Sequence, residues 1–332
     1  MIGFRGRLSR QHWRWKLGST IIRPPAERRR TERRPVSRRA LVLGVLACVS
    51  WSTVFVLGRM TIRHHATDPV VLGLYRFGLT GLILAATLIV AGRGRDLGVV
   101  LREPAPFLFL GLTGGFAMGF FVFLALQHTH SIVVQVIMNS NPVLIVPLSV
   151  LVGERVGVSK VCGVALGVAG CVLVLTGVTP EQVHESPHHV LGGVLAGLSG
   201  LSWAAYTVFG RRVVRRHGGL VTTTLSMLIG GVAFLVTCLV MGKGLVLPWR
   251  GALAGLYLAI VPTAFGFTAW YVALKDLPAN VLGPLQFIVP IGGVALALLL
   301  LPDERLTTPM LVGGALALGG IYLSTRTSRA ET

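Results

Sequence analysis

Apolar residues gather into ten long runs along this chain of 332 residues, with short polar segments between the runs. A helix needs about 20 mostly apolar residues to cross a bilayer core, and each run is long enough. The runs lack the alternation of apolar and polar positions that membrane-spanning β-strands show, and a helix satisfies its own backbone groups in lipid. We therefore predict an all-α integral membrane protein with ten transmembrane helices, at residues 40–58, 70–91, 105–126, 132–152, 158–178, 190–209, 220–242, 252–274, 279–301 and 308–325.

The first and sixth predicted helices contain the same motif. Residues 50–59 read SWSTVFVLGR and residues 202–211 read SWAAYTVFGR, with five identities at a constant offset of 152. Further matches follow in the same order, namely Pro142 with Pro290 and Glu154 with Glu304. The chain is therefore expected to consist of two related halves, residues 40–178 and 190–325, joined by an extracytoplasmic linker at 179–189.

Basic residues indicate how the predicted helices are oriented, because Lys and Arg are enriched in cytoplasmic loops. With the N-terminus inside, 12 of the Lys and Arg residues after residue 39 fall in cytoplasmic segments and 5 in outer segments. Both termini are therefore predicted to be cytoplasmic. Because each half has five helices, the second half enters the membrane from the opposite side. The two five-helix repeats are thus predicted to be inverted, as in several secondary transporters.

The net charge of +19 comes largely from the N-terminal segment, since 13 of the 31 Lys and Arg residues precede Ala40. We expect residues 1–39 to be a basic, disordered cytoplasmic tail that contacts the anionic inner leaflet, and residues 326–332 to be a second cytoplasmic tail. The basic segment has no pattern of a nucleic-acid-binding module, so nucleic acid is not an expected partner. The four cysteines form no CxxC pair, so neither a metal site nor a disulfide framework is expected. No cofactor is expected either.

With these features the chain resembles the EamA-type transporters of the drug/metabolite transporter superfamily. The resemblance covers residues 40–325. It rests on the repeated Trp motif, on LYRFGLTGLIL at 74–84, on a proline ahead of a glutamate in each half, and on glycine-rich fifth and tenth runs. GER at 153–155 follows the family pattern, whereas DER at 303–305 departs slightly from it. The resemblance implies a ten-helix inverted repeat in the cytoplasmic (inner) membrane that moves small metabolites, often outward.

Several residues are candidates for lining a substrate path. Arg76 lies inside a predicted helix, where a charge is costly and should face protein or water. It could anchor an anionic group such as a substrate carboxylate; the alternative is a bond to backbone carbonyls that holds helices together.

Trp51 and Trp203 lie in mid-helix, away from the interface where Trp usually anchors, and are candidate cavity walls or packing residues. The same alternatives hold for Tyr206, Trp270 and Tyr271.

Polar side chains precede Pro142 in the fourth predicted helix. Gln135 and Asn139 share one helix face, and Asn141 adds a further amide. Pro142 has no N–H, so it frees the backbone carbonyl of Met138. We predict that this patch lines the cavity, with plain hydrogen bonding between helices as the alternative. The matching region of the second half contains Gln286 and Pro290, and a kink in the eighth helix is expected at Pro262 and Thr263.

No acidic residue lies in the middle of a predicted helix. Glu154 and Glu304 come at helix ends beside arginines, where local salt bridges or anchoring of the helix end are expected. Proton relays usually need a buried carboxylate or histidine, so proton coupling has no evident carrier. Arg59 and Arg211, which end the repeated motif, are expected to be membrane anchors, and the seven histidines of the outer segments are expected to be solvated.

These features predict a secondary transporter that exports small metabolites, such as amino acids or drug-like compounds, by alternating access, and not an enzyme. A lipid translocator and a membrane-embedded enzyme are the alternatives. An enzyme of that kind usually clusters His, Asp or Glu near one leaflet, and no such cluster occurs on the predicted inner side.

GxxxG spacings at Gly163/Gly167 and Gly193/Gly197 allow close approach of helices and could support a homodimer.

Overall fold

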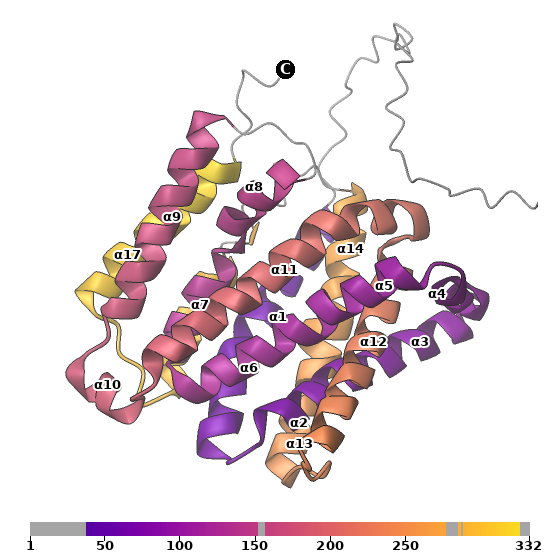
Figure 1. Ribbon diagram of the computed structural model, residues 1–332, viewed down its shortest axis with the longest axis horizontal. Coiled ribbons are helices and arrows are strands. Elements are labelled where there is room, and N and C mark those ends of the chain that lie inside the picture. The colour runs from indigo at the N-terminus through magenta and orange to yellow at the C-terminus, as the bar shows by residue number, and fades with distance from the viewer. Residues whose placement is uncertain (1–37, 152–156, 277–284, 287, 326–332) are drawn as a thin grey trace, which may run out of the picture. The chain divides into compact units, whose positions relative to one another are not determined.

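The computed structural model describes residues 38–151, 157–276, 285–286 and 288–325 (Figure 1). Every regular element within these ranges is helical, which confirms the all-α membrane class. The tails at residues 1–37 and 326–332 lie outside the described residues. Eight helices are long and apolar enough to cross a membrane, and they are numbered here as spans 1 to 8: Arg38–His64, Pro69–Val90, Pro104–His128, Ser131–Leu148, Val158–Thr176, His189–Gly210, Gly219–Val240 and Trp249–Trp270.

Two shorter apolar helices follow at the positions of the predicted ninth and tenth spans. They are α16 (Ile288–Leu300) and α17 (Thr308–Thr325). The ninth helix is predicted to begin at residue 279, but residues 277–284 lie outside the described part of the chain. The total of ten transmembrane helices therefore stays a prediction. The sixth helix is longer than predicted, because α11 (His189–His217) continues beyond residue 209.

Several spans are built from more than one helical segment. Spans 2, 3 and 8 each contain a π-helical stretch between two α-helical parts. The other helical elements are, in chain order, α1 (Arg38–Arg59), η1 (Met60–His64), α2 (Pro69–Gly73), η2 (Leu74–Gly78), α3 (Leu79–Val90), η3 (Gly94–Gly98), α4 (Val99–Arg102), α5 (Pro104–Leu110), η4 (Gly111–Ala117), α6 (Met118–His128), α7 (Ser131–Asn139), α8 (Asn141–Leu151), α9 (Val158–Thr176), α10 (Pro180–Glu185), α12 (Gly219–Val240), α13 (Trp249–Leu258), η5 (Ala259–Phe265) and α14 (Gly266–Asp276).

Local sequence explains where several of these helices begin or break. The Asp68 carboxylate accepts hydrogen bonds from the N–H groups of Val70 and Val71, and Pro69 occupies the first turn, so span 2 starts there. Span 4 breaks at Ser140, just before Pro142. The amide of Asn141 donates to the carbonyl of Met138 at 3.1 Å. A side chain thus satisfies the carbonyl that the proline leaves without its helical donor.

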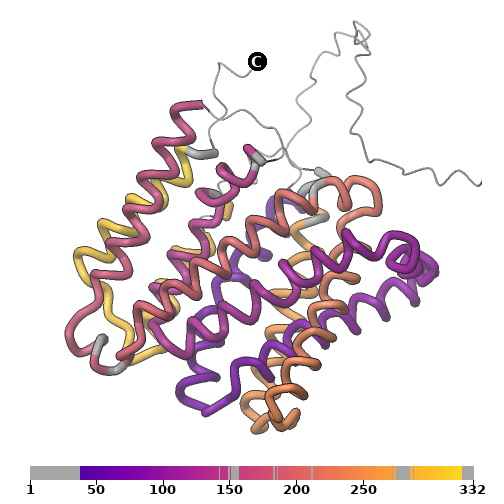
Figure 2. The backbone as a smooth tube through the Cα atoms, in the orientation of Figure 1, coloured from indigo at the N-terminus to yellow at the C-terminus, as the bar shows by residue number. Residues whose placement is uncertain are grey.

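The packing of the spans repeats between the two halves of the chain. Span 1 packs against span 8 and α16, and span 6 packs in the same way against spans 3 and 4. Span 2 packs against span 7, and span 5 against α17. In Figures 1 and 2, α9 and α17 lie side by side, as do α6 and α11. Exchanging each span with its counterpart in the other half leaves these pairs unchanged, as a molecule built from two related halves requires.

Glycines bring α9 and α17 into backbone contact. A methyl group on Gly320 would overlap the backbone of Gly163 and Gly167, and one on Gly170 would overlap the backbone of Gly313 and Ala317. Small residues allow transmembrane helices to approach in this way. The Gly163/Gly167 spacing noted in the sequence therefore packs within the chain, between its fifth and last described helices.

Gly320→Ala is expected to lower the free energy of unfolding by about 1–3 kcal/mol, because the new methyl group forces the two backbones apart. Gly314 on the same helix has open space around it, so Gly314→Ala should be neutral or should stabilise the protein by up to about 1 kcal/mol through helix propensity. Thermal unfolding of the two purified variants measures the difference. Equal unfolding temperatures would contradict the close contact.

Candidate functional site

The π-helical segment η5, in the middle of span 8, is a meeting point of candidate residues. Pro262 has no N–H, so the carbonyl of Leu258 lacks its usual helical donor. The hydroxyl of Thr263 donates to that carbonyl at 2.7 Å. Two neighbouring spans also bond to this segment, since Trp51 Nε1 donates to Pro262 O at 2.7 Å and Thr80 Oγ1 donates to Ala259 O at 3.1 Å. The irregular backbone of span 8 is thus held by side chains from spans 1 and 2.

Arg76, in the π-helical stretch of span 2, contacts the same segment. Its side chain is 5% exposed, and its Nε donates to Thr263 Oγ1 at 3.1 Å. The guanidinium carbon lies 4.8 Å from the ring centre of Phe77 and 5.7 Å from that of Phe123. Among the described residues, no carboxylate lies within 4.0 Å of the Arg76 side-chain nitrogens, the distance that defines an ion pair. Arg76 is therefore a buried cation held by a hydroxyl and two rings, and its bond to Thr263 joins spans 2 and 8.

Five aromatic rings form a continuous series between spans 1, 6 and 8. Trp51 lies 5.3 Å from Trp270 and 5.6 Å from Phe267, measured between ring centres. Phe267 lies 5.8 Å from Trp203, which stacks on Tyr206 at 5.3 Å. We call Trp51, Trp203, Tyr206, Phe267 and Trp270 the aromatic cluster. The three tryptophans are only partly buried, so the cluster presents apolar surface while remaining partly accessible.

The amides of span 4 bond to backbone groups. Gln135 is 1% exposed, and its Nε2 donates to Pro290 O at 2.7 Å, which ties span 4 to α16. Its amide packs directly on Gly293. Asn139 donates to the carbonyl of Gln135 at 2.8 Å. In this conformation Gln135 holds two helices together, which is the alternative interpretation of the polar patch, while Asn139 and Asn141 remain partly exposed.

Four sequence candidates are not brought into these contacts by described side chains. Gln286 is exposed in the turn before α16. The helical backbone is described at Pro142 and Tyr271, but their side chains are not. Glu154 lies outside the described residues.

Arg59 and Glu304 form a buried ionic cluster with Asp303, away from the aromatic cluster. Arg59 is 0% exposed. Its Nη1 donates to the carbonyl of Thr129, and its Nη2 pairs with Asp303 Oδ2 at 2.5 Å. Its Nε lies 3.5 Å from Glu304 Oε1. The expectation that Arg59 is a membrane anchor is therefore wrong, because the side chain is buried and paired with residues of the second half.

Glu304 anchors a helix end, but the helix belongs to the other half of the chain. Its two carboxylate oxygens accept hydrogen bonds from the N–H groups of Ser131 and Ile132, at the start of α7. A carboxylate is favoured there because the first N–H groups of a helix are unpaired and carry partial positive charge. Burial raises the pKa of Glu304, and Arg59 opposes that effect. Within the described ranges, no three His, Cys, Asp or Glu side chains are grouped as a metal site.

His130 differs from the solvated histidine that the sequence predicts. It is 0% exposed beside the ionic cluster. Burial lowers its pKa to about 4, and the charge of Arg59 acts in the same direction. The correction follows from the packing of the loop between spans 3 and 4 under Arg59, which places the ring in the protein interior.

Because of His130, the folded protein should become less stable as the pH is lowered. In the unfolded chain the imidazole titrates near pH 6.5, so between about pH 6.5 and 4 the unfolded state binds a proton that the folded state does not. This difference in proton binding does not affect the free energy of unfolding above about pH 6.5. It lowers the free energy of unfolding by on the order of 3 kcal/mol as the pH decreases to 4. Thermal unfolding at pH 7 and pH 5 should show a smaller drop for His130→Gln than for the unaltered chain. The exposed His184 provides the control, and an equal drop in His184→Gln and His130→Gln would contradict the assignment.

Comparison with known proteins shows which family the chain belongs to. A family model described as the EamA-like transporter family matches residues 38–176 and again residues 190–326. The chain belongs to the EamA-like transporter family. Among relatives, the aromatic amino acid exporter YddG of Ancylobacter novellus is 30% identical over 296 residues, 87% of this chain and 98% of that protein. The probable amino-acid metabolite efflux pump of Escherichia coli is 28% identical over 301 residues, 87% and 95% of the two chains.

A solved crystal structure also resembles this EamA-like transporter. It aligns with a TM-score of 0.62 at 26% identity, over 88% of this chain and 97% of that one. These matches extend over most of both chains in each pair. They confirm the family resemblance found in the sequence and the assignment of the protein as a small-metabolite transporter.

Sequence reasoning missed one member of the aromatic cluster of this EamA-like transporter. Phe267 joins the rings of Trp51 and Trp203. Its spacing of three residues from Trp270 places both rings on one face of α14, which is the signal that could have identified it. Thr80, whose hydroxyl bonds to span 8, follows Arg76 by four residues and could have been found in the same way.

Proposed function

We propose that this transporter exports small metabolites that combine a carboxylate with an apolar or aromatic side chain, with amino acids as the main class. The buried guanidinium of Arg76 carries this proposal. Its Nε is bonded to Thr263, and no carboxylate of the described residues pairs with it. An uncompensated buried charge is unfavourable, so a carboxylate that arrives with the substrate would be stabilised by a charge-assisted, bidentate contact.

The aromatic cluster supports the second part of the proposal. Trp51 connects the aromatic cluster with the surroundings of Arg76. Its indole N–H bonds to the carbonyl of Pro262, and the next residue, Thr263, has the hydroxyl that accepts from Arg76. Ligand sites are typically lined by apolar and aromatic side chains, with a few polar groups that set orientation. An apolar substrate side chain would lie against the rings while its carboxylate is held at Arg76. The names of the relatives, an aromatic amino acid exporter and a probable amino-acid metabolite efflux pump, favour the same class.

Transport is proposed to occur by alternating access between the two halves, 40–178 and 190–325, as inverted repeats in the cytoplasmic membrane with both termini inside. The protein would act without enzymatic chemistry. The ionic cluster joins the two halves through Arg59 and Glu304, so it would have to rearrange when the halves move apart. The basic tail would contact the anionic inner leaflet.

Flux in proteoliposomes tests the proposal. Phenylalanine should be transported with saturation, whereas phenylalaninamide, which has the same ring and no carboxylate, should be transported at least about tenfold more slowly. A nucleoside and a fluorescent phospholipid complete the panel. Equal transport of the acid and the amide would contradict the role of the carboxylate. Lipid translocation without flux of any solute would favour the lipid translocator instead.

A further inference from the structure

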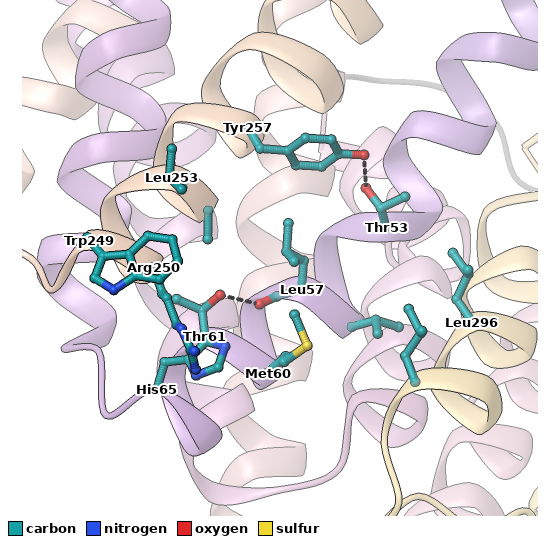
Figure 3. A pocket seen from close by; sticks show the side chains of 13 residues that line it. Thr53, Leu57, Met60, Thr61, His65, Trp249, Arg250, Leu253, Tyr257 and Leu296 are labelled. Carbon is teal, nitrogen blue, oxygen red and sulfur yellow. Dashed lines mark hydrogen bonds between the residues drawn. The ribbon is translucent and has the colours of Figure 1, made fainter.

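A cavity, called here the lateral cavity, lies beside the α13 part of span 8 (Figure 3). Its volume is about 460 Å³, within the range of about 300–1,000 Å³ typical of ligand sites. Span 1 forms one side of it, and span 8 and α16 form the others. The walls are apolar, and Leu253 and Leu300 are each 56% exposed at its edge. Because these leucines face outward from a membrane protein, the cavity opens toward lipid.

Polar side chains occupy the two ends of this lateral cavity. Arg250 and His65 line one end, and Tyr257 with Thr53 line the other (Figure 3). The Tyr257 hydroxyl donates to Thr53 Oγ1 at 3.2 Å. Arg250 stacks on Trp249 at 5.3 Å from the ring centre, and within the described part of the chain no ion pair joins Arg250 or His65 to a carboxylate. The cavity is therefore an apolar slot with cationic and protonatable groups at one end.

The place related to this cavity by the repeat, between spans 3 and 6, is built differently. At the offset of 148 that relates η4 to η5, Tyr257 matches Phe109. At the offset of 152 of the repeated motif, Leu57 matches Phe209. Phe109 and Phe209 pack edge to face, with ring centres 5.5 Å apart. Two rings thus meet between spans 3 and 6 where Tyr257 and Leu57 line open space between spans 8 and 1, so the two related positions are built differently.

We propose that the lateral cavity binds an anionic phospholipid, with one acyl chain along the leucines and the phosphate at Arg250 and His65. The apolar walls match an acyl chain, which is the solvent at this surface. Arginine binds phosphate oxygens through several donors at once. Trp249 is 68% exposed at the same end, as expected of a tryptophan at the membrane interface, where lipid headgroups lie. The charge at that end selects an anionic headgroup over a zwitterionic one.

Native mass spectrometry of the full chain, released from vesicles of equal parts phosphatidylglycerol and phosphatidylcholine, tests the proposal. The unaltered protein should retain phosphatidylglycerol preferentially, and Arg250→Gln should reduce this retention about fivefold, the effect of one basic residue near a headgroup. Arg102 occupies the matching position of the first half and is exposed, so Arg102→Gln is the matched control and should leave retention unchanged.

A second pair of variants tests the slot without changing charge. Leu253→Trp fills the cavity from an exposed position and should also reduce retention. Ala105→Trp, at the matching exposed position of the first half, should not. Unfolding temperatures close to that of the unaltered chain establish that the variants are folded. Equal retention of both lipids, or equal effects of Arg250→Gln and Arg102→Gln, would overturn the proposal. A dimer signal abolished by Leu253→Trp would assign the cavity to a second copy of the chain and would overturn it as well.

Discussion

Arg76→Lys is expected to reduce transport of a carboxylate-bearing substrate by about 10–100-fold, even though the positive charge is kept. Lysine loses the planar fork that binds a carboxylate through two parallel hydrogen bonds, and a hydrogen bond to a charged group contributes about 1.5–3 kcal/mol. Lysine also has a methylene group in place of Nε, so it has no donor where Arg76 donates to Thr263. The reduction should appear in the concentration dependence of phenylalanine flux in proteoliposomes, as a higher half-saturating concentration.

Two comparisons separate this expectation from a loss of structure. Arg93 is exposed and pairs with Asp96 on the surface, so Arg93→Lys should leave flux unchanged. Thr263→Val removes the partner of Arg76 while keeping the guanidinium, and should have a smaller effect than Arg76→Lys. Unaltered substrate affinity in a folded Arg76→Lys protein would rule out direct bidentate binding at this residue.

Arg59→Met is expected to destabilise the protein by about 3–5 kcal/mol, the usual effect of removing one partner from a buried ion pair. The substitution leaves the Glu304 carboxylate buried at the start of α7 without its nearby cation, and it frees the carbonyl of Thr129. Thermal unfolding of the purified protein in detergent measures the effect. The pair joins the first half to the loop before α17, so the loss should extend to the contact between the halves.

Arg63→Met provides the matched control, because Arg63 lies one turn further along span 1 and its side chain is exposed. It should change stability by less than about 0.5 kcal/mol. Combining Arg59→Met with Glu304→Gln should cost less than the sum of the single changes, since the double variant no longer buries an unpaired charge. Additive effects of the two substitutions would show that Arg59 and Glu304 do not act as a pair.

The sequence allowed much of the local structure to be predicted. A long apolar run crosses lipid as a helix, which satisfies its own backbone groups, so the spans follow from hydropathy with small shifts of their ends. Likewise, Pro142 frees the carbonyl of Met138 by its covalent structure, and an amide within three residues was available to bond to it. The family model matches residues 38–176 and 190–326 separately, close to the two halves that the repeated Trp motif predicts.

The sequence could not identify the partners of charged residues near helix ends. Arg59 looked like a membrane anchor because its neighbours in sequence are apolar, yet its carboxylate partners lie more than 240 positions away. Gln135 looked suited to substrate coordination, but its amide meets a carbonyl of α16. In both cases the outcome depends on which face of a helix is covered by a helix from the other half.

For this protein, the sequence alone determined the membrane class, the positions of eight spans, the two-fold repetition and the family. Each of these follows from backbone hydrogen bonding in lipid and from residues close together in the chain. Only the tertiary structure decided that Arg76 contacts span 8, that Phe267 joins the rings of Trp51 and Trp203, and that Glu304 binds the start of α7. These contacts connect distant segments, and they arise from the combined packing of many helices, which no local pattern of residues specifies.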